Sequence, residues 1–433
     1  MTVSQLPSRK PDAWDAKAHH IGSPPSGFRN PWPSFTKLGL GLAFKLRFGN
    51  NPEKKFVPVP EGPNGTRSDE LVKVRKPDWG LASKDKLRAT WLGHASFLIE
   101  LPAAPGAERG VRILCDPVFS ERTSPSQWIG PKRYSPPPCT LDELPDVDIL
   151  CISHNHYDHL DHATVQHVYD KRRGNLHVFT SLGNRQWFMQ HVGCHDDDVT
   201  ESDWWDSYEL NIGGLGSVKL TCCPIQHGSG RSLLDQGSTL WCSWIIEAGG
   251  KKAYFSGDTA YQAPNTPSPC PAFVQIGQLF GPFDLAMVPI GLMTPQSFMG
   301  SVHATPEQSL EIHKEVKSKL SIGMHYGTVR GGEHEHGWGD ERRHVLTLTP
   351  LSRHQRPLRG RTRSVQKMAR RGREARSVVW WRRGRAWRAC RHGQGRRRSL
   401  RHWRDGSCLI LYELGGKATS GLGAAASLWI PLG

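Results

Sequence analysis

Short apolar runs rich in β-branched and aromatic residues alternate with polar clusters between about residues 89 and 330, and this pattern predicts strands. The predicted strands are Thr90–Glu100, Val111–Cys115, Val147–Ser153, Leu176–Thr180, Val218–Cys223, Leu240–Glu247, Lys252–Ser256, Leu285–Ile290 and Leu320–Met324. Helices are predicted at His162–Lys171, Asn184–Val192 and Pro306–Lys319. Thr305 and Gln308 form a capping box at the start of the last one. Groups of strands with helices between them indicate a layered α/β domain.

The regions on either side have a different texture. Residues 1–88 are rich in Pro, Gly and charge, and we expect a partly ordered N-terminal arm. Its one apolar island, Leu38–Phe44, is flanked by basic residues, which suits either an interfacial membrane segment or a part of the arm packed on the main domain. Residues 331–433 are biased toward Arg, Gly and Trp and show neither helical nor strand periodicity. We interpret this tail as a disordered segment or as the product of a misread intron or shifted reading frame.

The net positive charge of the chain equals the surplus in that tail. The chain has 56 Lys and Arg against 40 Asp and Glu, a net charge of +16. Residues 331–433 hold 23 of the basic and 7 of the acidic residues, which leaves 33 of each sign before residue 331. Residues 1–330 taken together are therefore formally neutral, so an RNA-binding interpretation depends on the tail alone, and we expect no nucleic-acid partner.

The cysteines and the hydropathy of the chain indicate the cellular compartment in which the protein resides. The ten cysteines form no CxxC pair and no regular framework, so we expect buried thiols in a reducing compartment. No stretch approaches the roughly 18 apolar residues of a spanning helix. The first residues lack the apolar run of a secretory signal. We expect an intracellular protein, and both a monomer and a homodimer remain open.

One segment carries most of the predicted chemistry. His154, His156, Asp158 and His159 follow directly after the apolar strand that ends at Ser153. Alternate histidines at the end of a strand can converge on one metal ion, while the Asp-His pair turns to a second. Imidazole and carboxylate without thiolate suit zinc, and also manganese or iron.

Three residues downstream complete the predicted set. His227, Asp258 and His325 each follow an apolar run, so each is expected at a strand end. We assign His154, His156 and His227 to one ion and Asp158, His159 and His325 to the other, with Asp258 as the bridging carboxylate. His94 is expected to play a structural or supporting role rather than to bind a metal. Trp204 and Trp205 are expected in the core or at its edge, and Lys132 and Arg133 in a solvated loop.

The order of these ligands resembles the metallo-β-lactamase superfamily. The resemblance implies an αββα four-layer sandwich with two zinc ions at one edge of its two sheets. Within that superfamily the chain is most similar to the phospholipases D that hydrolyse N-acylphosphatidylethanolamine. The similar segments run from about Asn30 to Thr328 and are Asn30–Pro33, Trp91–Ser96, Asp116–Ser120, Ser124–Gln127, Gly130–Arg133, Trp204–Trp205, Gln226–His227, Gly257–Thr259, Gly281–Leu285 and His325–Thr328.

This narrower resemblance implies a reaction and its residues. The metal pair would hold a hydroxide that attacks phosphorus, releasing N-acylethanolamine and leaving phosphatidate. Asp158, Asp258 and His303 are the expected catalytic residues, and His303 is expected to contact the phosphate or help protonate the leaving oxygen. The phospholipid substrate implies peripheral association with an intracellular membrane, with mitochondria as an alternative location.

Several functions other than that of a phospholipase D remain open. They are a lactonase or other soluble metal-dependent hydrolase, an RNA-processing nuclease, and a binding protein whose metal site no longer turns over. Gly228-Ser229 and the loop Gly291–Pro295 depart from the pattern of the phospholipases D. Since both are expected near the mouth of the site, the acyl preference does not follow from the resemblance.

Overall fold

The structure is a computed structural model that describes residues 1–37, 74–329, 347–348, 378–383 and 386–391. It divides into two units, Met1–Pro350 with Leu411–Gly433, and Leu351–Ile410. The apolar island Leu38–Phe44 and most of the tail from residue 331 lie outside the described residues.

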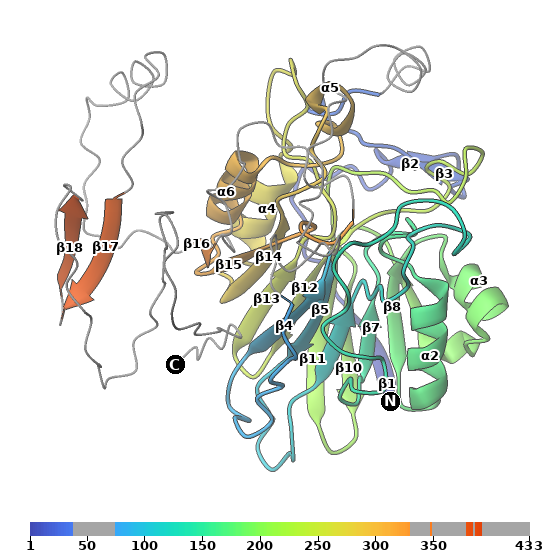
Figure 1. The fold of residues 1–433 in the computed structure, drawn as a ribbon. Coiled ribbons are helices and arrows are strands. Elements are labelled where there is room, and N and C mark those ends of the chain that lie inside the picture. The colour runs from blue at the N-terminus through green and yellow to red at the C-terminus, as the bar shows by residue number, and fades with distance from the viewer. Residues whose placement is uncertain (38–73, 330–346, 349–377, 384–385, 392–433) are drawn as a thin grey trace. The chain divides into compact units, whose positions relative to one another are not determined.

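The first unit contains a six-stranded mixed sheet whose strands are ordered β4-β5-β6-β7-β8-β9 (Figure 1). Strands β6 to β9 run parallel to one another, while β4 and β5 form an antiparallel hairpin at one edge. The bounds are β4 Arg88–Gly93, β5 Ser96–Glu100, β6 Arg112–Cys115, β7 Ile149–Cys151, β8 His177–Ser181 and β9 Val199–Ser202.

A second sheet of eight strands has the order β1-β10-β11-β12-β13-β14-β15-β16. Strands β13, β14 and β15 are parallel, and the other neighbours in this sheet are antiparallel. The bounds are β1 Thr2–Leu6, β10 Ser207–Ile212, β11 Gly216–Cys223, β12 Ser243–Ala248, β13 Lys251–Phe255, β14 Leu285–Pro289, β15 Ser321–Met324 and β16 Thr347–Leu348.

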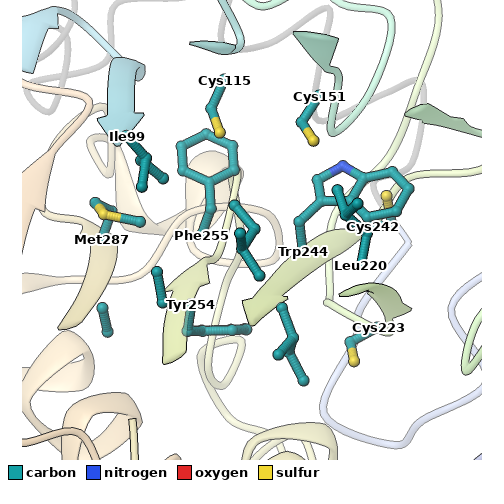
Figure 2. Close-up of a cluster of buried hydrophobic side chains, with 14 of the residues drawn as sticks. Ile99, Cys115, Cys151, Leu220, Cys223, Cys242, Trp244, Tyr254, Phe255 and Met287 are labelled. Atoms are coloured by element: carbon teal, nitrogen blue, oxygen red, sulfur yellow. The ribbon is translucent and has the colours of Figure 1, made fainter. Parts of the chain in front are cut away.

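Successive side chains along a strand point to opposite sides, and in the six-stranded sheet both sides are buried. Ile99, Cys115 and Cys151 point toward the eight-stranded sheet and join one core with Trp244 and Phe255 (Figure 2). The intervening residues Leu98, Leu114 and Leu150 belong to a second core on the opposite face. A strand buried on both faces reads as a continuous apolar run, and this explains why these strands are easy to find in the sequence.

Helices cover the outer faces of both sheets. Val165, Val168 and Tyr169 of α2 (His162–Arg172) pack into the second core, over the six-stranded sheet. Outside the eight-stranded sheet, α4 (Ala272–Leu279) and α6 (Pro306–Glu315) pack on one another, and α6 also contacts β14. The other helices of the described residues are short: α3 (Arg185–Trp187), a π-helix (Phe188–Val192), a 3-10 turn (Asp196–Asp198) and α5 (Gln296–Met299). The predicted αββα sandwich is confirmed.

The predicted helices and strands were right where the buried face of an element has a clear apolar pattern. The capping box of Thr305 and Gln308 is present as predicted. The predicted strand Thr90–Glu100 is in fact two strands, because the chain reverses at Gly93 and His94, both of which have positive φ. The predicted helix Asn184–Val192 is one α-helical turn followed by the π-helix. Strands β1, β9 and β10 and helix α4 were not predicted, since their polar edges or short length hide the pattern.

The N-terminal arm contributes to the same unit. Strand β1 pairs with β10 at the edge of the eight-stranded sheet. The hairpin of β2 (His20–Ile21) and β3 (Gly27–Phe28) follows, and His19 stacks on Trp204 with ring centroids 4.2 Å apart. Trp204 and Trp205 are buried, which confirms that they belong to the core.

Three remaining predictions concern the tail, the cysteines and hydropathy. In the second unit, β17 (Val378–Arg383) and β18 (Ala386–Arg391) form an antiparallel hairpin that the residue pattern does not predict. The eight cysteines with described side chains are all free and buried, as predicted. Among the described residues, no helix has the length and apolar character that crossing a bilayer requires.

Candidate metal centre

The predicted ligands come from strand ends that meet at one edge of the sandwich. Strands β6, β7, β11, β13 and β15 all run toward this edge, as their pairing shows. The segment after β7 carries His154 to His159, and the segments after β11, β13 and β15 carry His227, Asp258 and His325. The structure therefore brings all seven predicted ligands to one place, although His154 and His325 are 171 positions apart in the chain.

A first group of ligands consists of three imidazoles. His154 Nε2 lies 2.9 Å from His156 Nδ1, and His227 Nε2 lies 3.3 Å from the same atom. The other ring nitrogens of two members are occupied: His154 Nδ1 is 2.9 Å from the Ser153 hydroxyl, and His227 Nδ1 donates to the Val302 carbonyl at 2.8 Å. These partners leave the Nε2 lone pairs facing inward, where a metal ion could accept them.

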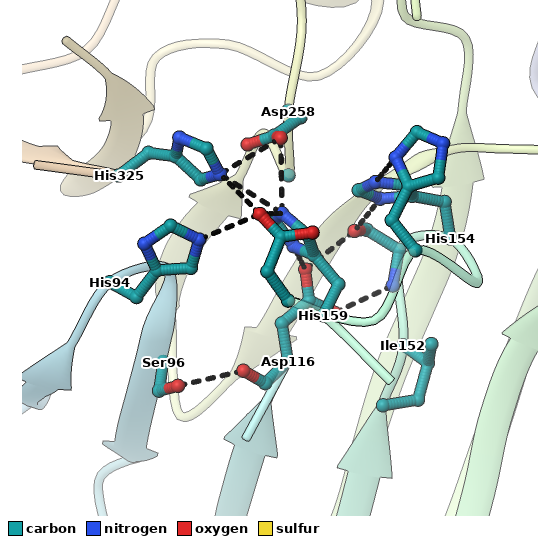
Figure 3. Close-up of polar contacts among 12 residues, drawn as sticks. His94, Ser96, Asp116, Ile152, His154, His159, Asp258 and His325 are labelled. Atoms are coloured by element: carbon teal, nitrogen blue, oxygen red, sulfur yellow. Dashed lines mark hydrogen bonds and ion pairs between the residues drawn. The ribbon is translucent and has the colours of Figure 1, made fainter. Parts of the chain in front are cut away.

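A second group combines imidazoles with carboxylates (Figure 3). His159 Nε2 and His325 Nε2 lie 3.2 Å apart, and Asp158 Oδ2 is 3.3 Å from His325 Nε2 and 3.8 Å from His159 Nε2. His94 Nε2 lies 2.9 Å from Asp158 Oδ2, so the side chain of His94 can orient that carboxylate. Around these atoms, His94 and His325 both have positive φ, a conformation that a packed site must hold in place.

Asp258 lies between the two groups. Its Oδ2 is 3.0 Å from both His159 and His325, and 3.9 Å from His227 Nε2 in the first group. Its Oδ1 is buried and has no hydrogen-bond partner among the described residues. Gly257 allows this approach, because a Cβ there would lie 2.6 Å from Ser153 Cβ. Asp258 therefore lies within reach of ligand residues in both groups.

The electrostatics of the two groups differ. Burial and the neighbouring imidazoles lower the pKa of His154 well below its ordinary value, and burial also lowers the pKa of His227. In the second group burial again opposes protonation, but Asp258 and Asp158 prevail and raise the pKa of His325 to about 9. The same two carboxylates raise the pKa of His159 well above its ordinary value. The first group thus presents neutral donors, whereas the second attracts positive charge.

These donor sets fit divalent metal ions. The inward-facing ring nitrogens of the first group lie about 3 Å from one another and present lone pairs to the same space, and a cation between them removes this conflict. Imidazoles with carboxylates, without thiolate, are the donor set of hydrolytic zinc sites and also suit manganese or iron. His154, His156 and His227 would hold one ion, and Asp158, His159 and His325, with His94 beside them, the other. Asp258 Oδ2 lies within 3.9 Å of ligands in both groups.

The sequence analysis did not identify Asp116 as a functional residue. Its Oδ2 accepts from His159 Nδ1 at 2.7 Å and from the Ser153 hydroxyl at 2.5 Å, and that hydroxyl also contacts His154. The buried carboxylate of Asp116 therefore orients one ligand in each group. Residues that hydrogen-bond to metal ligands in this way affect the affinity and activity of a metal site. The signal was present in the sequence: Asp116 follows the apolar strand β6, as the ligands follow theirs.

The N-terminal arm supports the site from behind. The side-chain amide of Asn30 donates to the carbonyl of His227 at 2.7 Å. Ser34 and Gln226 are hydrogen-bonded to each other at 2.5 Å, and Gln226 also donates to the Ser301 carbonyl. The arm thus helps to hold the segments that carry His227 and His303, a link that spacing alone does not reveal.

His303 lies beside both groups. Its Nδ1 is 3.8 Å from Asp258 Oδ2 and has no hydrogen-bond partner among the described residues. Its ring packs near those of His227 and His325, with centroids 5.2 and 5.3 Å away. Burial lowers the pKa of His303 to about 3, so its imidazole is neutral at physiological pH. It can therefore donate one hydrogen bond to a ligand at the metal centre.

Access to this buried centre is limited. Asp158 has a side chain that is 21% exposed, and His156 is half-buried, whereas the other five ligands are buried. Asp158 and His156 therefore form the solvent-accessible side of the site.

Comparison with known proteins finds a matching family model and several similar chains. The family model described as "Beta-lactamase superfamily domain" matches residues 111–326. The chain is 38% identical over 257 residues to N-acyl-phosphatidylethanolamine-hydrolyzing phospholipase D 1 of Caenorhabditis elegans, covering 59% of this chain and 67% of that protein. It is 32% identical over 269 residues to the mitochondrial N-acyl-phosphatidylethanolamine-hydrolyzing phospholipase D of Saccharomyces cerevisiae, covering 61% and 53%. A metal-dependent hydrolase of Methanopyrus kandleri is 26% identical over 249 residues, covering 56% and 85%.

Proposed function

This chain belongs to the β-lactamase superfamily and shares a family with N-acyl-phosphatidylethanolamine-hydrolyzing phospholipases D, and on this premise we propose that it hydrolyses N-acylphosphatidylethanolamine. The products are N-acylethanolamine and phosphatidate. The observation that carries the proposal is Asp258 Oδ2, which lies within 3.0 to 3.9 Å of ligands in both groups. Such a shared carboxylate is the arrangement expected of two ions acting together on one phosphodiester.

We propose that both ions are zinc. When bound, a pair of divalent ions supplies Lewis acidity and lowers the pKa of a water molecule enough for attack on phosphorus at neutral pH. A new bond forms between the water oxygen and phosphorus, the bond from phosphorus to the ethanolamine oxygen breaks, and a proton reaches the leaving oxygen. The protein's own task is to hold the ligands rigidly and to orient the phosphodiester.

Asp258 and Asp158 have separate tasks in this scheme. Asp258 is buried between the groups, so it fixes the distance between them. Asp158 is held by His94 on the accessible side of the site, where the substrate's phosphate approaches. The neutral His303 donates a hydrogen bond to a phosphoryl oxygen. Since its pKa is near 3, His303 orients the phosphate rather than delivering the proton.

The direct test measures metal content and lipid hydrolysis on the same preparation. Purified protein should hold two zinc ions per chain and release N-acylethanolamine from vesicles that contain N-acylphosphatidylethanolamine. Two bound ions without lipid hydrolysis would favour a lactonase or another soluble hydrolase. A protein that binds no metal would rule out the proposal altogether.

His303 offers a sharper test of the roles. His303→Ala should lower turnover while bound zinc stays unchanged, and His303→Gln should recover part of it, because its amide can donate a hydrogen bond. Full activity in the alanine variant would remove His303 from the mechanism. His191→Ala is a control, because this exposed histidine lies on the short π-helix away from the ligands.

The proposed substrate also suggests a location. A phospholipid with two acyl chains and a third on nitrogen stays in a bilayer, so the enzyme would act at the surface of an intracellular membrane. The yeast relative is named as a mitochondrial protein, which favours mitochondria among the alternatives. Fractionation of cells that express the protein would test this.

A further inference from the structure

Four large apolar side chains are almost bare of protein contacts. Trp128 and Ile129 are 89% and 71% exposed, and Leu233 and Leu234 are 95% and 98% exposed. Every other exposed large hydrophobic side chain among the described residues is at most 53% exposed. A single exposed Leu is ordinary. Two pairs of neighbouring apolar residues with such large exposed fractions indicate a surface that a lipid bilayer or another molecule covers.

The first pair lies at the apex of a closed loop, Glu121–Arg133. Its base is held by backbone hydrogen bonds from Arg133 to Glu121 and from Thr123 to Pro131. The Arg122 guanidinium donates across the loop to the Gly130 carbonyl at 2.7 Å. The exposure of the pair is therefore built into a structured turn.

The second pair lies at the apex of another closed loop, Gly230–Gly237. The Asp235 carboxylate accepts from the backbone of Arg231 at 3.0 Å and of Ser232 at 2.7 Å. The backbone of Gly237 donates to Ser229 and closes the base. Local polar contacts thus hold Leu233 and Leu234 outward, without any apolar neighbour to cover them.

Both loops are joined to the segments that carry the metal ligands. The first loop is bonded to the segment after His325, through the bridge of Arg133 with Val329. In the second loop, the Arg231 guanidinium donates to the carbonyls of Asn155 and Leu160, at 2.9 Å each. The loops start after β6 and β11, and these strands end at the edge of the sandwich where the ligands gather (Figure 1).

We propose that these two apolar tips, Trp128-Ile129 and Leu233-Leu234, insert into the interfacial region of a phospholipid bilayer and hold the metal centre against it. The inference rests on the proposed function, since that substrate resides in a bilayer. Two small separate tips suit a lipid surface, because a protein interface needs a continuous apolar centre. Trp is also a residue that favours the membrane interface, where its ring is half apolar and half polar.

The site's geometry supports this partner over a second copy of the chain. The scissile phosphate of a bilayer lipid lies at the interface, and the partly exposed Asp158 lies on the solvent-accessible side of the ligand cluster. Because the two loops are bonded to the ligand segments, their insertion would place Asp158 at the depth of the lipid headgroups. Lys132 and Arg122 flank the first tip, and their cationic groups suit lipid phosphates, although Glu121 pairs with Lys132 at 2.5 Å.

The test compares a tip variant with a matched surface variant. The tip variant carries Trp128→Ser, Ile129→Ser, Leu233→Ser and Leu234→Ser, and the control carries Leu81→Ser and Val274→Ser, at exposed apolar positions on other elements. Both are mixed with vesicles of phosphatidylcholine alone and of phosphatidylcholine with a minor share of N-acylphosphatidylethanolamine. Sedimentation measures binding, and release of N-acylethanolamine measures hydrolysis.

We expect each lost side chain to weaken vesicle binding by roughly tenfold if fully inserted, so the four substitutions together should weaken it by up to about 10⁴-fold, and by at least about 100-fold with partial insertion. Its hydrolysis of a soluble, short-chain phosphodiester and its melting temperature should match the control. Brominated lipids should quench part of the tryptophan fluorescence of the unmodified protein, and Trp128→Phe should lose that part.

Vesicle binding by the tip variant equal to that of the control would overturn the inference. So would light scattering in which the tips determine dimer formation while vesicle binding is unchanged, since the tips would then be a protein interface. Tip-dependent vesicle binding by a protein that hydrolyses no phosphodiester would support the surface and refute the proposed function, so the two failures are distinguishable.

Discussion

The two ligand groups lie side by side and share Asp258, yet they are built differently. The group of His154, His156 and His227 has three imidazoles whose pKa values are lowered, so its ligands are neutral before any ion arrives. The group of His159 and His325 faces two carboxylates that raise the pKa values of its imidazoles.

The difference teaches that ligand identity alone does not set the behaviour of a metal position. In the first group, burial is the main influence on the imidazoles. In the second, burial is just as complete, but the charges of Asp158 and Asp258 overcome it. The second position therefore holds protons when it holds no metal, and we expect the two positions to differ in how they load and respond to pH.

The largest effect is expected from Asp258→Asn, because this change removes the charge that both groups share. Activity should fall by at least about 10³-fold, and neither ion should survive dialysis. Metal analysis after dialysis, with the assay of N-acylethanolamine release, measures both outcomes. Retention of two ions at unchanged activity would show that Asp258 does not link the groups.

A matched pair of variants should separate the groups. His154→Ala is expected to empty the first position and His325→Ala the second, each leaving about one ion per chain and costing roughly 10² to 10³-fold in activity. Metal analysis of both proteins measures the occupancy. If either variant loses both ions, the positions depend on each other and the comparison fails.

A smaller loss is expected from Asp116→Asn, which removes an outer carboxylate that contacts both groups. Metal affinity or activity should fall by about 10 to 100-fold, the usual cost of an outer partner. Competition with a chelator gives the affinity of each position. Asp206→Asn is a control at a carboxylate outside the site, and it should leave both affinities unchanged.

The smallest effect is a difference in proton release when metal-free protein takes up zinc. At pH 7 His325, with a pKa of about 9, is protonated and must lose its proton, as must His159, so the second position should release about two protons. The first position should release none, because its imidazoles are already neutral. As the pH rises through 9, the release from His325 should disappear. Calorimetry in buffers of different ionisation enthalpy measures this; equal release at both positions would contradict the comparison.

Much of the fold could be read along the chain because buried parallel strands are continuous apolar runs. The strands that end at Cys115, Cys151 and Met324 were predicted within one or two residues, and so was the start of α6. Strand β1 and the arm around Asn30 could not be placed, because their partners lie some 200 residues away and local pattern carries no information about them.

The amino-acid sequence by itself determined which side chains could bind metal, since the ligand types and their place after apolar strands are local properties. Only the tertiary structure decided that Asp116 orients a ligand of each group, and that the carboxylates outweigh burial at His325 but not at His154. Distances between strand ends set these effects, and a distance across two packed sheets depends on every side chain between them.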